Sequence, residues 1–305
     1  MIFLVDASVY VFRAYRSMLP DMRDRDGNPM HAVFGFARFL GDLIERVRPA
    51  YMAVAFDGRR AVSYRSRLYP AYKANREPAP ADLRLQLERC RELCRQLGVA
   101  AFVDTEYEAD DLIGTLATLM RAAGVCSAFI TRDKDLAQLV RDGDLFWDFG
   151  WRGQFGYHDV ERHFGVAPER FADYLALTGD EVDNIPGVPG IGRRTAATLM
   201  KAFASLDELY ADLPAVALLP LRGAATLGAR LAAHRESVYL ARSLTRIACN
   251  LSLGVEVEAL RRRPPDVPAL AALYDRLGFG PFLRRQGERL AQLPLAHVPL
   301  RSARA

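Results

Sequence analysis

Ile2-Phe-Leu-Val-Asp6 is a short apolar run that ends in an acid, and the chain repeats this pattern at Ala53-Val-Ala-Phe-Asp57 and Phe129-Ile-Thr-Arg-Asp133-Lys-Asp135. Short apolar runs between polar residues predict strands, here over residues 2–5, 51–56, 100–103, 125–131 and 144–149. Segments with helical periodicity lie between them, over residues 32–47, 81–97 and 108–123. Strands that alternate with helices predict an α/β body built on a parallel sheet.

The second half of the chain has a different pattern. The alternation of strands and helices ends after about residue 155, and the pattern is then helical to about residue 250. A segment rich in Pro and Gly interrupts it at residues 184–192. We therefore expect an α/β domain over residues 1–160, a smaller helical domain over residues 161–290 and a disordered tail over residues 291–305.

Composition excludes several classes of protein. Half of the 305 residues are apolar and 26% are charged, as in globular proteins. No run approaches the ~18 apolar residues of a membrane span, and Met1 leads directly into the first predicted strand, so we expect neither membrane insertion nor secretion. The four cysteines lack metal-ligand spacing, and a reducing cytoplasm is the expected location. The net charge of +4 is only a weak indication of nucleic acid.

Acids that follow separate strands should meet at one edge of the predicted sheet, because the carboxyl ends of parallel strands lie together. A further group, Glu108, Asp110 and Asp111, begins a predicted helix. One acid alone would be explained as a helix cap or a turn residue. Five or more would repel one another unless a cation held them. Oxygen ligands without a nearby His or Cys favour Mg²⁺ or Mn²⁺, so we expect a metal site.

A second acidic cluster, with Asp180 and Asp183, runs directly into the turn at residues 184–192. A Gly-x-Gly turn before a helical segment is typical of a helix–hairpin–helix, which we expect over residues 184–200. Its backbone N–H groups would bind DNA phosphates without sequence specificity. A plain interhelical turn is the alternative. The residues expected to contact DNA are Gly187, Gly190, Gly192, Arg193, Arg194 and Thr195.

A basic segment over residues 59–80 holds six cations and three tyrosines. This mixture suits single-stranded nucleic acid, because rings stack on bases while cations follow the phosphates. A solvated amphipathic helix would show a similar run of charge. The position of the segment, directly after Asp57, favours the first interpretation, since a polyanionic substrate needs cations beside an acidic metal site. Arg13, just after Asp6, is placed to reach the same substrate.

Together these motifs resemble the 5′–3′ exonuclease domain of bacterial DNA polymerase I, within the flap endonuclease family. The resemblance runs in order from residue 1 to about residue 290. It implies a PIN-like, Rossmann-like parallel sheet with flanking helices, a helical arch at about residues 59–80 and a helical DNA-binding domain with a helix–hairpin–helix. The motifs that match are Leu4-Val-Asp6-Ala-Ser, Tyr72-Lys73-Ala-Asn-Arg76, Tyr107-Glu-Ala-Asp-Asp111, Asp133-Lys-Asp135 and Gly179-Asp-Glu-Val-Asp-Asn-Ile-Pro-Gly-Val.

The resemblance also implies roles for individual residues. It suggests two Mg²⁺ ions, for which Mn²⁺ can substitute, and a K⁺ ion held by backbone carbonyls around residues 182–191. The first metal set would be Asp6, Asp57, Glu108, Asp110 and Asp111, and the second Asp133, Asp135, Asp180 and Asp183. Lys73 would contact the scissile phosphate, with Arg76 as its basic neighbour. Arg13 and Arg65 would engage the 5′ strand, and Tyr72 would lie near the unpaired end. Arg132 stands where the family usually has glycine, and no acid of the set is missing.

The implied activity is two-metal hydrolysis of DNA phosphodiesters at 5′ ends and branched junctions, by a monomer in the bacterial cytoplasm and nucleoid. A branched-DNA-binding protein without cleavage is one alternative, against which the complete acidic set argues. A PIN-type ribonuclease is another, against which the hairpin and the basic segment argue. A haloacid-dehalogenase-type phosphatase would need an acid two positions after Asp6, where Ser8 stands.

Overall fold

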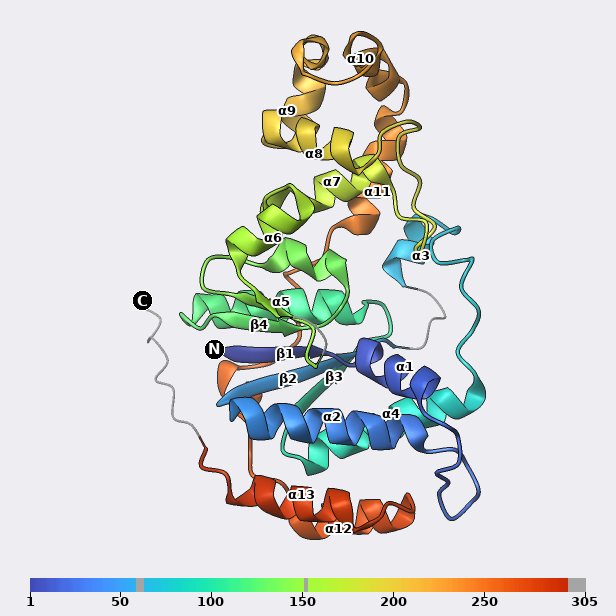
Figure 1. Cartoon of the computed structure of the whole chain (residues 1–305), viewed down its shortest axis with the longest axis vertical. Coiled ribbons are helices and arrows are strands. Elements are labelled where there is room, and N and C mark those ends of the chain that lie inside the picture. The colour runs from blue at the N-terminus through green and yellow to red at the C-terminus, as the bar shows by residue number, and fades with distance from the viewer. Residues whose placement is uncertain (59–62, 151–152, 296–305) are drawn as a thin grey trace.

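A parallel sheet forms the centre of the molecule (Figure 1). The computed structural model describes residues 1–58, 63–150 and 153–295. Within these residues six strands form one sheet, in the order β3-β2-β1-β4-β5-β6. The strands are β1 (Ile2–Asp6), β2 (Tyr51–Phe56), β3 (Ala100–Val103), β4 (Ser127–Ile130), β5 (Leu145–Trp147) and β6 (Gln154–Phe155). Only β6, a short edge strand that we did not predict, is antiparallel to its neighbour. The expected parallel sheet is thus confirmed.

Helices cover both faces of this sheet. Those of the α/β body are α1 (Ala7–Ser17), α2 (His31–Val47), α3 (Tyr64–Leu68), α4 (Ala81–Gln96) and α5 (Ala109–Ala122). Successive residues of a strand point to opposite faces, so β2 serves two cores. Ala53 belongs to the same buried cluster as Leu116 of α5, whereas Val54 belongs to the cluster that contains Leu40 of α2. Burial on both faces explains why these strands are continuous apolar runs.

The order of the strands determines where a ligand can bind. The chain proceeds from β1 through β2 to β3 on one side, and then returns to β4 and β5 on the other side of β1. The crevice outside the carboxyl ends of two such strands is the usual ligand site of an open α/β sheet. Asp6 ends β1, and Asp133 lies just beyond β4. The fold therefore brings these two acids to the point where the strand order reverses.

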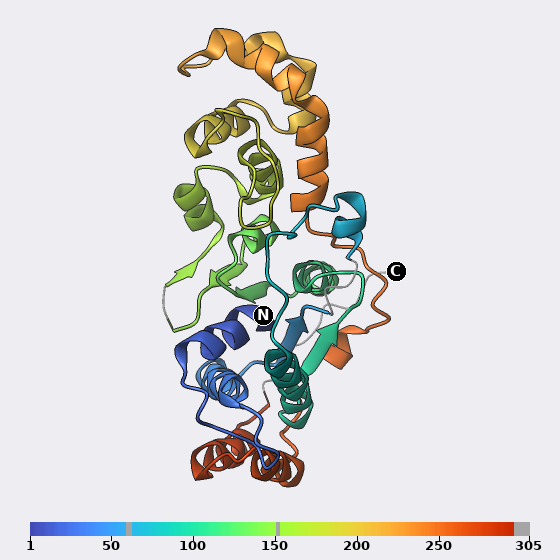
Figure 2. The same ribbon diagram turned by 90° about the vertical axis from the view of Figure 1, so that its right-hand side faces the viewer.

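The helical region shares a core with one face of the sheet. Its elements are α6 (Tyr157–Phe164), η2 (Pro168–Arg170), α7 (Phe171–Thr178), α8 (Arg193–Ala202), α9 (Leu206–Ala211), η3 (Leu213–Leu218), α10 (Ala224–Ala233) and α11 (Arg235–Thr245). Phe171 of α7, Leu199 of α8 and Leu244 of α11 belong to the same buried cluster as Leu116 of α5. The region extends away from the sheet along the long axis of the molecule (Figure 2). A shared core positions α7 and the loop after it relative to the acidic edge.

The last two helices return to the α/β body. After η4 (Val257–Leu260), α12 (Val267–Arg276) and α13 (Pro281–Gln292) pack beneath α2 and α4 (Figure 1). Gln286 donates to Asp42 at 2.9 Å, and Arg289 donates to Glu45 at 2.8 Å. This corrects the expected helical domain over residues 161–290, since α12 and α13 pack on the α/β body. Helical periodicity shows that a segment is a helix, but it does not show which part of the protein the helix packs against.

Parts of two expected segments lie outside the described residues. These are residues 59–62 at the start of the expected arch and residues 296–305 of the expected tail.

Among the described residues, no helix has the length and apolar character that a membrane span requires. Cys90 and Cys94 are buried on α4 and form no disulfide.

Candidate active site

Three of the predicted acids lie at the carboxyl edge of the sheet. Asp6 ends β1 and is only 4% exposed, while Asp57 follows β2 and Asp133 follows β4. Asp57 accepts hydrogen bonds from the Ser8 hydroxyl at 2.7 Å and from the amide of Ala109, the first residue of α5, at 3.0 Å. This carboxylate therefore links β2 to the starts of α1 and α5. The convergence that the strand pattern predicts is present.

The start of α5 brings further acids to this edge. Glu108 is the N-cap residue and forms a capping box with Asp111, while Asp110 lies in the first turn. Acids are favoured there by the positive end of the helix dipole. The capping interpretation of this motif is therefore present in Glu108 and Asp111, which satisfy backbone N–H groups at the start of the helix.

Asp111 is the member that does not face the other acids. It is fully buried and accepts hydrogen bonds from the Arg65 guanidinium at 2.6 and 2.8 Å. The amides of Glu108 and Ala248 donate to the same carboxylate at 3.1 and 2.9 Å. A carboxylate has about four lone-pair positions, so these donors occupy them all. In this structure Asp111 is a structural partner of Arg65, not a metal ligand as predicted.

The predicted role of Arg65 changes for the same reason. The side chain is 2% exposed, and its remaining N–H groups donate to the carbonyls of Leu244 at 2.8 Å and Arg246 at 3.0 Å. The guanidinium thus holds α3 against α5 and the end of α11, and it is not available to a 5′ strand. The sequence could not show this, because a buried Arg and a substrate-binding Arg have the same local pattern of neighbours.

The second acidic set lies beside η1 (Lys134–Leu139). Lys134 donates to Asp180 at 2.5 Å and lies 3.3 Å from Oδ1 of Asp135. The amide of Asp135 donates to Asp133 at 3.0 Å. Asp180 also accepts the amide of Val182 at 2.9 Å, which shapes the loop over residues 180–184, called here the acidic loop. All of the predicted second set is therefore present around η1 and this loop.

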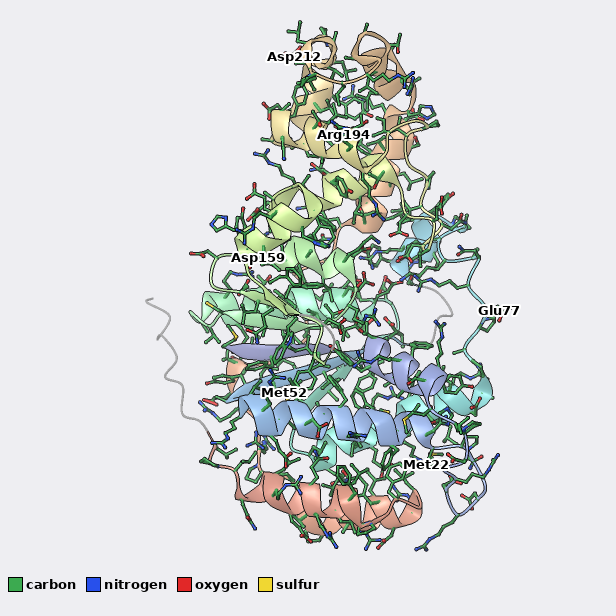
Figure 3. All side chains as sticks on the ribbon, in the orientation of Figure 1. Met22, Met52, Glu77, Asp159, Arg194 and Asp212 are labelled. Carbon is green, nitrogen blue, oxygen red and sulfur yellow. The ribbon has the colours of Figure 1, made fainter. Side chains whose placement is uncertain are left out.

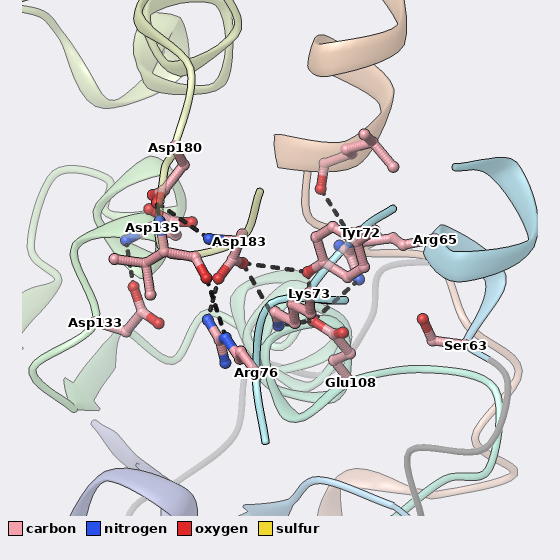
Figure 4. Close-up of polar contacts among 12 residues, drawn as sticks. Ser63, Arg65, Tyr72, Lys73, Arg76, Glu108, Asp133, Asp135, Asp180 and Asp183 are labelled. Carbon is pink, nitrogen blue, oxygen red and sulfur yellow. Dashed lines mark hydrogen bonds and ion pairs between the residues drawn. The ribbon is translucent and has the colours of Figure 1, made fainter. Parts of the chain in front are cut away.

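Residues 69–76, called here the docked segment, lie against the acidic loop (Figure 4). The Lys73 ammonium donates to Glu108 at 2.8 Å and lies 3.5 Å from a carboxylate oxygen of Asp183. This lysine therefore bridges an acid of the first set and an acid of the second.

Two neighbours of Lys73 reinforce this contact. Arg76 pairs with Asp183, and the Tyr72 hydroxyl lies 3.0 Å from Glu108 and 3.3 Å from Asp183. Tyr72 is 6% exposed, so its ring is buried rather than presented to an unpaired base. The predicted stacking role of Tyr72 therefore does not fit this arrangement. Lys73 and Arg76 both pair with Asp183, a carboxylate that the resemblance assigns to the second metal.

Buried acids at this edge raise one another's pKa. The pKa of Asp6 is raised to about 7, mainly by burial and further by the charges of Asp57 and Asp133. The pKa of Asp135 is also raised to about 7, mainly by burial and further by the charge of Asp133. Burial, then Asp133 and Asp6, raises the pKa of Asp110 well above its ordinary value. Mutual effects of this kind require the carboxylates to be close together, and they favour binding of a cation.

The donor set fits a hard divalent ion, although the acids are not arranged around one. Oδ1 of Asp135 is buried and accepts no hydrogen bond among the described residues, and its ionic partner is the Lys134 ammonium at 3.3 Å. A metal ion in place of that ammonium would satisfy this oxygen. As they stand, no three Asp, Glu, His or Cys side chains of the described ranges are positioned to hold an ion. The physical reason is that Lys73, Arg76 and Lys134 hold part of the set.

The metal-free protein is expected to be more stable at about pH 6 than at about pH 8.5. The raised pKa values of Asp6 and Asp135 mean that the folded state binds these protons more tightly than the unfolded chain does. Stability therefore falls as the pH rises from the unfolded pKa to the folded pKa. Thermal melting in chelator measures this, and added Mg²⁺ should remove most of the difference. A melting temperature in chelator that is higher at pH 8.5 contradicts a repulsive cluster.

The predicted hairpin over residues 185–192 packs on the end of α7. A Cβ on Gly187 would lie 2.4 Å from the carbonyl carbon and oxygen of Thr178, so the close contact of two backbones requires glycine there. Gly190 has a left-handed φ of 77°. Gly192 is the N-cap residue of α8, and a Cβ there would meet no atom within 4 Å. Gly187 thus serves packing, whereas Gly192 leaves the helix start open.

The cations at the hairpin are exposed. Arg193 and Arg194 begin α8, and Figure 3 labels Arg194 in this helix. Thr195 follows them in the first turn and is partly exposed. Arg230 of α10 adds a cation that the sequence did not predict, because it lies about 40 residues away and donates to the Pro189 carbonyl at 3.3 Å. That carbonyl is in the range where the resemblance suggested K⁺.

Arg13 and Arg132 share one acid at the edge of the site. Arg13 lies 3.5 Å from Asp148 and stacks over the Tyr10 ring, while Arg132 contacts Asp148 at 3.1 Å. Asp148 is buried and lies just after β5. The arginine that replaces glycine at position 132 therefore supplies Asp148 with an ion-pair partner.

Gln138 is a positioning residue that sequence reasoning missed. It is buried, and its amide donates to the carbonyls of Asp135 and Thr245, both at 3.0 Å. Its oxygen accepts the amide of Ile247 at 3.0 Å. Gln138 therefore fixes η1, which bears Asp135, to the segment after α11. The available signal was a polar residue in an apolar helical stretch, which the sequence alone does not distinguish from a surface position.

Comparison with known families identifies the architecture. The model of the 5′–3′ exonuclease N-terminal resolvase-like domain matches residues 1–165, and that of the 5′–3′ exonuclease C-terminal SAM fold matches residues 166–268. The chain belongs to the 5′–3′ exonuclease family. Membership in this family confirms the expected fold class.

Relatives of this chain are found among sequences and solved structures. DNA polymerase I of Pseudomonas aeruginosa is 41% identical over 278 residues, which cover 90% of this chain and 30% of that protein. The chain spans about a third of the length of the curated polymerases it matches. A T5 5′-exonuclease with bound zinc ions has a TM-score of 0.66 at 19% identity, covering 95% of this chain and 98% of that one. The catalytic core of Rad2 with DNA substrate has a TM-score of 0.62 at 16% identity, covering 97% and 92%.

Proposed function

We propose that this exonuclease uses divalent ions to hydrolyse DNA phosphodiesters at 5′ ends and branched junctions. The observation that carries the proposal is the group of acids at the carboxyl edge of the sheet, where Asp6, Asp110 and Asp135 have pKa values raised partly by their neighbours' charges. Such a group is unfavourable for the fold by itself, which indicates that it is kept for a bound cation.

The metal ligands in this proposal come from two sets. The first consists of Asp6, Asp57, Glu108 and Asp110, and the second of Asp133, Asp135, Asp180 and Asp183. Asp111 is left out because Arg65 and two amides occupy its oxygens. Two Mg²⁺ ions, or Mn²⁺ in their place, would supply an activated water and stabilise the leaving oxygen. The all-oxygen donor set favours these ions over zinc.

Lys73 would add positive charge at the scissile phosphate. Its ammonium already lies between the two acidic sets, 2.8 Å from Glu108 and 3.5 Å from Asp183. A cation at that point favours a phosphate whose charge increases in the transition state. Arg76, which pairs with Asp183, is proposed as its partner on the same strand of DNA.

The hairpin and its arginines would hold the duplex. The start of α8 offers backbone N–H groups and the positive end of a helix dipole, beside Arg193 and Arg194. The solved Rad2 core is a complex with DNA substrate, and this chain shares its fold. We further propose a monomer that acts in the cytoplasm at the nucleoid, and a K⁺ ion at the hairpin carbonyls that Arg230 leaves unbound.

Cleavage of labelled 5′-flap, nicked and single-stranded DNA, with Mg²⁺, Mn²⁺ or chelator, tests this function. We expect cleavage of the flap and of the nicked duplex that a chelator abolishes. The same flap made of RNA separates a deoxyribonuclease from a ribonuclease. Tight binding of flap DNA without cleavage at any concentration of Mg²⁺ or Mn²⁺ would reject the enzyme and favour a structural DNA-binding protein.

Arg230→Ala is expected to weaken duplex binding and to lower its salt dependence. If Arg230 contacts one phosphate, the slope of log K against log salt should fall by about 0.9. Binding of a duplex oligonucleotide at several salt concentrations in chelator measures this. Arg25→Ala is the matched control, because Arg25 is exposed in the loop between α1 and α2, at the other end of the molecule. An unchanged slope for Arg230→Ala would show that this arginine only supports the hairpin.

A further inference from the structure

The docked segment is fixed to the acidic loop by backbone as well as by charge. The amide of Lys73 donates to the Asp183 carbonyl at 2.9 Å, and the Asn184 side chain donates to the Ala71 carbonyl at 2.7 Å. Asn75 donates to the Glu181 carbonyl at 3.0 Å. These two stretches lie more than 100 residues apart in the sequence, so only tertiary structure brings them together.

The charges across this contact are those that the reaction would use. Lys73 and Arg76 both pair with Asp183, and Lys73 also pairs with Glu108. A divalent ion on Asp183 and a DNA phosphate on Lys73 would each replace one side of these pairs. The docked arrangement therefore competes with both ligands. It neutralises Asp183 of the second acidic set, as a bound ion would.

Asn184 is suited to hold this arrangement. Its φ is +56°, a left-handed conformation that Asn tolerates better than most residues. That backbone turn directs the side chain across to the docked segment, where it makes its bond to the Ala71 carbonyl. The contact involves no carboxylate and no cation. Asn184 therefore contributes to docking without belonging to either charged set.

We propose that Asn184 is a positioning residue that keeps Lys73 and Arg76 on the acidic loop until metal and DNA replace them. The proposal rests on the proposed function, since it treats Asp183 as a metal ligand and Lys73 as a phosphate contact. Ion binding and strand binding are then linked, because each releases part of the same contact. The chain thus covers Asp183 with its own substrate-binding cations.

Asn184→Gly tests this with the least disturbance, because glycine keeps the left-handed backbone and removes only the side-chain bond. We expect faster hydrogen exchange at the Lys73 amide in chelator without DNA. We also expect Mg²⁺ to bind about two- to tenfold more tightly in the absence of DNA, which corresponds to the loss of one competing hydrogen bond. Hydrogen exchange with mass spectrometry and calorimetric Mg²⁺ titration give the two readouts.

Asn28→Gly is the matched control, since Asn28 bonds Asp24 in the distant loop between α1 and α2 and should change neither readout. A mere loosening of the acidic loop would weaken Mg²⁺ binding, so weaker binding overturns the proposal. Unchanged exchange overturns it, and so does faster exchange with unchanged Mg²⁺ affinity. If the unmodified protein bound no Mg²⁺ at all, the proposed function would fail, while exchange would still report docking.

Discussion

Arg65→Met is expected to destabilise the protein by about 3–5 kcal/mol, because it leaves a buried carboxylate without its charged partner. Asp111 is fully buried, and Arg65 donates two of its hydrogen bonds. Arg65 also satisfies the carbonyls of Leu244 and Arg246, which would lose their donors. Urea unfolding in chelator, followed by circular dichroism, measures the change.

Two further variants make this test specific. Arg67→Met removes an exposed cation of the same short helix, whose partner is Glu106, and should cost at most about 1 kcal/mol. Combining Arg65→Met with Asp111→Leu should recover much of the loss, because no charge is then left buried. If Arg65→Met folded as stably as the unmodified protein but bound DNA poorly, Arg65 would be a DNA contact as the family resemblance implied.

Asp110→Asn is expected to lower the cleavage rate by at least about a thousandfold while stabilising the metal-free fold. The loss of rate follows from removing a charged ligand from ions that contribute several kcal/mol to the transition state. The gain in stability follows from removing a charge that Asp133 and Asp6 oppose. Single-turnover cleavage of a 5′ flap and thermal melting at about pH 8, with and without Mg²⁺, measure the two effects.

Asp142→Asn is the control for this variant, because the same chemical change is made at an exposed turn before β5. It should alter neither cleavage nor the Mg²⁺-dependent rise in melting temperature. Asp110→Asn should lose that rise in part or in full. A variant that kept both its cleavage rate and its response to Mg²⁺ would remove Asp110 from the metal set.

The α/β body could be predicted because its information is local. Apolar runs of strand length that end in acids are enough to place Asp6, Asp57 and Asp133 at one edge, since parallel strands align their carboxyl ends. The hairpin could also be predicted, because Gly and Pro in a short turn restrict the backbone whatever surrounds it. The position of α13 beneath α2 could not be predicted, because packing between distant helices depends on the whole core.

The sequence by itself indicated the kind of chemistry that we propose, because its acids follow separate strands, begin a helix and precede the hairpin. Only tertiary structure decided which members of that set are free. Asp110 and Asp111 are adjacent in the chain, yet one lies among like charges and the other is enclosed by Arg65 and the amide of Ala248. The physical reason is that the role of a carboxylate depends on the donors that surround it in space, and these come from parts of the chain that no local pattern connects.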